Sequence, residues 1–143
     1  MKPFLHLIAA ALAAAYIYSQ NLPLDWFSVR AQSTPATLHQ AFDQSLSNIQ
    51  IADEGIVIKI LDDDLKGSRH QRFILKLAHG QTVLIAHNID LSERIQGLKK
   101  GDHVAFYGEY EWNPKGGVIH WTHRDPARRH IGGWLKHQGN TYQ

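Results

Sequence analysis

The chain has 143 residues, and its 43% hydrophobic and 20% charged content suits one globular domain with a proper core. It contains no cysteine, which excludes disulfides, zinc–thiolate centres and a thiol nucleophile. The formal charge of +2 is too small to imply a polyanionic partner by itself. Ten histidines are the most unusual feature of the composition, so candidate sites centre on imidazole.

Residues 1–31 predict export. The segment is apolar from Phe4 to Tyr18, with His6 as its polar interruption. Such a run is short for a membrane helix, which needs about 20 residues, but it suits the apolar region of a signal peptide. The alternatives are an uncleaved anchor in the inner membrane and a buried helix. We expect a periplasmic or secreted protein that contacts a membrane only through this segment.

Residues 32–50 predict an amphipathic helix that precedes the main domain. Thr34 is a suitable N-cap, and Pro35 suits the first helical position. Apolar residues then recur at intervals of three or four, at Leu38, Phe42, Leu46 and Ile49. Residues 51–143 are expected to form the main domain.

The main domain is expected to be mainly β. Strands are predicted at residues 55–61, 69–78, 81–88, 101–112 and 118–123, because β-branched and aromatic residues alternate with polar ones there. A short helix is predicted at 91–98, a capped helical turn at 125–130 and a loop at 132–139. Three strands, a helix and two strands are the element order of a small five-stranded OB-like barrel.

Charge is unevenly distributed along the sequence. Residues 32–112 hold eleven acidic and eight basic side chains, whereas residues 113–143 hold one acidic and five basic ones. The basic, histidine-rich C-terminal segment therefore favours a local anion site over general polyanion binding.

The stretch GSRHQRF (67–73) is a candidate anion site. Arg69 and Arg72 could hold a phosphate or carboxylate through forked hydrogen bonds, with His70 as a general acid or base. The alternative is a solvated strand edge that carries positive charge.

The stretch HWTHR (120–124) adds His120, His123 and Arg124 as candidate ligand-binding residues. If this strand stays extended to residue 123, His120 and His123 point to opposite faces and cannot ligate one ion. The stretch is then one wall of a composite site.

A divalent metal is a candidate cofactor. His87 and Asp90 lie three residues apart at the end of a predicted strand, and imidazole with carboxylate suits a divalent ion. Asp62, Asp63 and Asp64 offer further oxygen ligands. The alternatives are solvated acidic turns and a turn shaped by Asn88 and Asp90.

Four linked motifs, GSRHQRFIL, LIAHNIDL, GEYEWNPKGGVIHWTHRDP and HIGGWLKHQG, resemble those of a family of short exported bacterial proteins classed as a domain of unknown function. The resemblance covers roughly residues 55–142. It implies a small secreted or membrane-anchored domain and no established activity.

The leading hypothesis is an extracytoplasmic OB-type binding domain for a small or oligomeric anionic ligand, with or without a metal ion that helps to bind it. The alternative is a metal-dependent phosphodiesterase or nuclease, in which His70 or His120 is the base and Arg69 or Arg72 stabilises the phosphorane. A third hypothesis is a structural envelope protein without a ligand. Nucleic acid is weakly supported as a partner, because Glu109 and Glu111 would repel its backbone.

Overall fold

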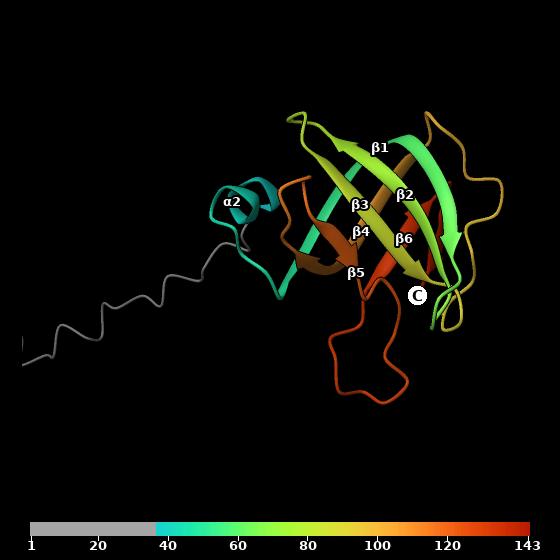
Figure 1. The fold of residues 1–143 in the computed structure, drawn as a ribbon. Coiled ribbons are helices and arrows are strands. Elements are labelled where there is room, and N and C mark those ends of the chain that lie inside the picture. The colour runs from blue at the N-terminus through green and yellow to red at the C-terminus, as the bar shows by residue number, and fades with distance from the viewer. Residues whose placement is uncertain (1–36) are drawn as a thin grey trace, which may run out of the picture. The chain divides into compact units, whose positions relative to one another are not determined.

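The computed structural model describes residues 37–143, so the export segment and the predicted cap at Thr34 lie outside the described residues. Within this range there are one helix and seven strands (Figure 1): α2 (Leu38–Asp43), β1 (Ile49–Asp64), β2 (His70–Leu77), β3 (Thr82–Asn88), β4 (His103–Glu111), β5 (Val118–His120), β6 (Trp134–His137) and β7 (Asn140–Tyr142). No helix in residues 37–143 is long and apolar enough to cross a membrane.

The seven strands form one sheet that closes on itself through five of them. The order is β1-β2-β3-β5-β4-β6-β7, and β1 also pairs with β4. All pairings are antiparallel except that of β3 with β5. Strand β4 pairs along one edge with β1 and along the other with β5 and β6. The prediction of a mainly β domain is confirmed.

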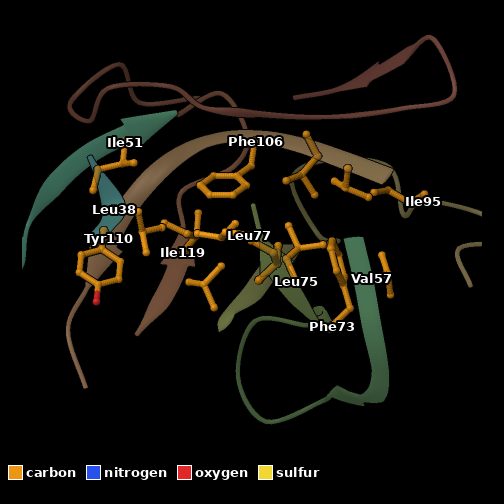
Figure 2. Packing of buried hydrophobic residues seen from close by; sticks show 14 of the residues in the cluster. Leu38, Ile51, Val57, Phe73, Leu75, Leu77, Ile95, Phe106, Tyr110 and Ile119 are labelled. Atoms are coloured by element: carbon orange, nitrogen blue, oxygen red, sulfur yellow. The ribbon is translucent and has the colours of Figure 1, made fainter. Parts of the chain in front are cut away.

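The core lies inside the ring of strands (Figure 2). In β2, Phe73, Leu75 and Leu77 are buried while the residues between them face outward, as a strand period of two requires. Figure 2 shows Leu38 of α2 at one end of the row of core side chains and Ile95 at the other. Both are buried and close the two ends of the core.

The amphipathic helix predicted at 32–50 is much shorter in the described residues. Helix α2 starts after Thr37, which forms a reciprocal capping box with Gln40, and it ends at Asp43. Ser45 and Asn48 then adopt positive φ angles of 52° and 59°, which turn the chain away from the helix. Ile49, predicted as helical, begins β1.

The helix predicted at 91–98 is wrong, because the segment between β3 and β4 is irregular. The side chain of Gln71 donates to the Ile95 carbonyl at 3.0 Å and accepts from the Ile95 N–H at 2.9 Å. Both backbone groups of Ile95 are thus satisfied without a helix, while its side chain fills the end of the core. A tertiary contact overrides the local helical pattern.

The C-terminal segment also departs from the predictions. Strand β5 ends at His120, residues 125–130 form no helix, and the predicted loop 132–139 contains β6 and the turn into β7. Gln138 and Gly139 form the two-residue turn with φ angles of 48° and 81°, both in the left-handed region that suits a hairpin. Glutamine is an unusual first residue for such a turn, so this hairpin lacks the usual sequence signal.

Candidate functional site

The candidate site lies on the outer face of β2, β3, β5 and β4. Ile119 and Tyr110 are buried in the core, so their strand neighbours point outward. Pairing places Glu109 of β4 opposite His120 of β5. On β2, His70 and Arg72 pair with Asn88 and Ala86 of β3 and share this outward face.

Two hollows meet at this face, and both are lined by His70 and His120. One has a volume of about 340 Å³ and the other about 330 Å³. The remaining lining residues of the first are Asp64, Arg72, Ala86, Glu111 and Val118, and those of the second are Ser68, Asn88, Leu91, Trp121 and His123. The structure therefore brings together four predicted site residues: His70, Arg72, His120 and His123.

His70 is held by a local hydrogen bond. Its Nδ1 lies 2.8 Å from the carbonyl oxygen of Ser68, which can only accept, so Nδ1 carries a proton. In the neutral ring, Nε2 is then the acceptor. His70 can accept a proton from a bound group or, once protonated, donate one to it.

Arg72 is positioned by the end of β1. Its Nε donates to the carbonyl oxygen of Asp62 at 3.0 Å. Within residues 37–143 the guanidinium forms no salt bridge, so its other N–H groups are not neutralised by a carboxylate. Arg72 is thus the cation that the first hollow offers to an anion.

His120 faces two carboxylates. Its Nε2 lies 3.4 Å from Glu109 Oε1 and 3.9 Å from Glu111 Oε1. That nitrogen is buried and has no hydrogen-bond partner among the described residues. Burial lowers the pKa of His120, although the charges of Glu109 and Glu111 act in the opposite direction. One nitrogen and two carboxylate oxygens lie within 4.8 Å of one another, a set that could hold a metal ion.

His123 reaches the same side as His120, contrary to the expectation for an extended strand. The strand ends at His120, and Trp121 adopts a φ of 51°, which turns the chain. A positive φ is rare for a bulky residue, and such strain is typical of functional sites. His123 is buried, with Nδ1 donating to the Arg124 carbonyl at 2.7 Å. Arg124 itself is exposed.

His130, which the sequence analysis did not single out, completes the site. Its Nε2 lies 2.7 Å from Glu109 Oε2 and its Nδ1 lies 2.7 Å from the Ile131 carbonyl. Both partners accept, so both ring nitrogens donate and the ring is an imidazolium. Burial lowers the pKa of His130, but the hydrogen bonds and charge of Glu109 outweigh it and leave the pKa raised. The ring of His130 stacks on that of Trp121, with the two ring centroids 3.9 Å apart.

The segment 121–133 carries Trp121, His123 and His130 and extends beyond the strands between β5 and β6 (Figure 1). The carboxylate of Asp125 accepts from the backbone N–H groups of Ala127, Arg129 and His130. These hydrogen bonds lower the pKa of Asp125. Asp125 therefore stabilises a compact loop where a capped helical turn was predicted at 125–130.

Arg69 and Asp90 bind each other. Asp90 accepts from Arg69 Nε at 2.6 Å and from the Arg69 backbone N–H at 2.8 Å. These contacts lower the pKa of Asp90. The pair joins the start of β2 to the residues that follow β3. Arg69, predicted to bind an anion, and Asp90, predicted to bind a metal, therefore bind each other instead.

His87, the other metal candidate, is fully buried. Its Nε2 lies 3.0 Å from the Glu93 carbonyl and its Nδ1 lies 2.8 Å from Thr122 Oγ1. Burial lowers the pKa of His87 to about 4, so the ring is neutral. Both nitrogens are occupied, which leaves no lone pair for a metal in this arrangement.

The acidic turn at Asp62–Asp64 is also divided among structural roles. Asp63 pairs with Arg94, and Asp64 Oδ1 accepts from the Lys66 N–H at 3.0 Å. The carboxylates that face His120 are instead those of Glu109 and Glu111. From the sequence these two residues were expected only to repel a nucleic-acid backbone; the local pattern gives no sign that β4 lies beside β5.

The family described as "Protein of unknown function (DUF3465)" matches residues 21–143. No curated protein matches the chain. No solved structure matches it either.

Proposed function

The chain belongs to the DUF3465 family of proteins of unknown function, and we propose that it is an OB-type binding domain that holds an anionic ligand over β2, β3 and β5. Such domains bind oligomeric ligands on the face of their second and third strands and the adjoining loops. The ring order β1-β2-β3-β5-β4, with β3 parallel to β5, supports this barrel type. The export signal predicted in residues 1–31 would place it outside the cytoplasm.

The observation that carries the proposal is the placement of Arg72 in the hollow shared by His70 and His120. A guanidinium without a carboxylate partner offers charged hydrogen bonds to phosphate or carboxylate oxygens. His70 adds an imidazole that can donate when protonated. Arg124 is exposed and follows His123, which lines the second hollow, and Arg128 and Arg129 are exposed further along segment 121–133.

We expect the binding of an anion to depend on Arg72. In ¹⁵N-detected NMR titrations of the full-length protein, inorganic pyrophosphate is expected to shift the amides of His70, Arg72 and His120, while maltohexaose, a neutral sugar, is not. Arg72→Gln should weaken pyrophosphate binding by about 10-fold or more, because a hydrogen bond to a charged group is worth about 1.5–3 kcal/mol.

Lys76→Gln is the matched control. Lys76 lies on the same face of β2 four residues further on, but it is exposed and lies outside both hollows. Its substitution should leave the affinity unchanged. An equal loss in the two variants would show that the net charge of the protein, and not this site, attracts the anion. A parallel titration with oligothymidylate tests whether an oligomeric anion occupies both hollows.

A metal-dependent phosphodiesterase is the second candidate. The observation that favours it is that His70, Arg72 and the His120–Glu109–Glu111 set adjoin one hollow. Cleavage of a fluorescent single-stranded oligonucleotide that requires Mn²⁺ and is lost in His70→Gln would support it. If the same oligonucleotide bound tightly but were not cleaved, the phosphodiesterase would be excluded and the binding-domain proposal would remain supported.

A further inference from the structure

We propose that Glu109, Glu111 and His120 form a binding site for one divalent transition-metal ion of the Zn²⁺ class. The site goes beyond anion binding and does not depend on it, because it rests on the positions of three ligand atoms. Among the candidate clusters of the described residues, this one combines an imidazole nitrogen with two carboxylate oxygens around one point.

The sheet fixes the positions of the three side chains. Glu109 and Glu111 are two residues apart on β4, so they share the outer face. His120 of β5 lies directly opposite Glu109 in the register. The ligands thus project from two hydrogen-bonded strands. Because this base is rigid, little conformational entropy is lost when an ion binds.

The distances fit a small divalent ion. Ligand atoms about 2.1 Å from a tetrahedral metal lie about 3.4 Å from one another. The separation of His120 Nε2 from Glu109 Oε1 is 3.4 Å. The separation from Glu111 Oε1 is 3.9 Å, and the Glu111 side chain, 39% exposed, has room to rotate and close that difference.

The polar groups of the cluster are not satisfied by one another. His120 Nε2 is buried without a hydrogen bond among the described residues, which is unfavourable for a polar atom. The Glu109 carboxylate is paired with His130, but that of Glu111 pairs with no Lys or Arg among residues 37–143. A divalent cation would accept the imidazole lone pair of His120 and neutralise the charge of Glu111.

His130 orients one of the ligands. It donates to Glu109 Oε2, which leaves Oε1 directed toward His120. Carboxylates that bind metals are commonly held in this way by a second hydrogen bond. One nitrogen and two oxygens suit Zn²⁺ or a similar ion, and three protein ligands leave a coordination position for an external group beside the hollow.

The test is a calorimetric titration of untagged, chelator-stripped full-length protein with ZnCl₂ at neutral pH, with no phosphate present. One equivalent is expected to bind. Glu109→Gln, Glu111→Gln and His120→Asn should each lower the affinity at least about 10-fold, as loss of metal-site contacts does. The absorption spectrum of the Co²⁺-loaded protein should change in Glu111→Gln, because one ligand is removed.

His103→Asn is the matched control, because His103 also lies on β4 and faces one carboxylate, Glu54, at 3.6 Å. It should keep the wild-type affinity. The proposal is overturned if the wild type binds no equivalent, if the three variants bind as tightly as the wild type, or if His103→Asn loses as much. Glu111→Gln is decisive should Glu109→Gln lower stability. A failed zinc titration would not contradict anion binding at Arg72, because the titration contains no phosphate and therefore tests only the metal site.

Discussion

His87 shows how a residue that is correct in type can have a different role. A histidine followed by an aspartate at the end of a strand suits a metal ligand, and the sequence predicts one there. In the folded chain His87 points inward instead, where it joins β3 to Thr122 after β5 and to Glu93 in the β3–β4 segment. It therefore cross-links the part of the ring that the short strand β5 leaves unpaired.

This role predicts a pH dependence of stability. The pKa of His87 is about 4 in the folded protein and 6.5 for an ordinary imidazole. The unfolded chain therefore binds more protons between these values, so the contribution to stability is complete above pH 6.5 and falls as the pH drops toward 4. The free energy of unfolding should fall by about 2 kcal/mol from this group between about pH 7 and pH 5.

Urea denaturation at the two pH values measures this loss. His87→Gln should remove that part of the pH dependence, while His79→Gln, which replaces an exposed histidine, should retain it. If the wild type and His87→Gln lose stability equally on acidification, the buried imidazole is not the group responsible.

At the scale of single elements, segment 121–133 is fixed at its end by a close approach of backbones. A Cβ added to Gly133 would lie 2.2 Å from the carbonyl oxygens of both Trp121 and Tyr107. Both atoms belong to the backbone and cannot move aside easily. A glycine is therefore required where the segment returns to β4 and becomes β6.

Gly133→Ala is expected to lower the free energy of unfolding by about 1–3 kcal/mol, as overpacking usually does. It should also move His130 away from Glu109, which NMR shifts of the His130 ring would report. Gly132→Ala is the control, because its Cβ would approach no atom closer than 3.4 Å. Equal stability of the two variants would contradict the close-packing argument.

Element types were predictable where one physical signal dominates. The alternation in β2, β3 and β4 reflects a ring with a buried inside and a solvated outside, so these strands were predicted nearly to their ends. The helix at 91–98 failed because Gln71, twenty-four residues from Ile95, satisfies its backbone. The hairpin of β6 and β7 was missed because its turn lacks the usual asparagine or aspartate.

At the scale of the whole molecule, the site is assembled by the closure of the ring. Residues from β2, β4, β5 and segment 121–133 meet only because β5 is inserted between β3 and β4. The sequence predicted His70, Arg72 and His120 as site residues, but not that Glu109 lies opposite His120. Strand order is a non-local property, and local periodicity does not contain it.

The proposed metal and anion sites adjoin the same hollow, which predicts coupling. Glu109 is already paired with the His130 imidazolium, but without a metal ion the carboxylate of Glu111 repels an anion. A bound ion neutralises Glu111 and offers the anion an open coordination position. Zn²⁺-loaded protein should bind pyrophosphate at least about five-fold more tightly than chelator-treated protein, with a reciprocal gain for Zn²⁺.

Calorimetric titration with pyrophosphate, with and without one equivalent of Zn²⁺, measures this coupling. Glu111→Gln should abolish the difference and His103→Asn should keep it. Equal pyrophosphate affinity in the loaded and metal-free wild type would show that the two sites are independent.

The pairing of β1 with β4 affects when the site forms as the chain folds. Ile49 pairs with Tyr110, about sixty residues later, and such long-range contacts form slowly. The residues of β2, β4, β5 and segment 121–133 that form the site come together only when the ring closes. A growing chain can therefore form the site only once segment 121–133 has been made, so ligand capture waits until these residues are available to close it.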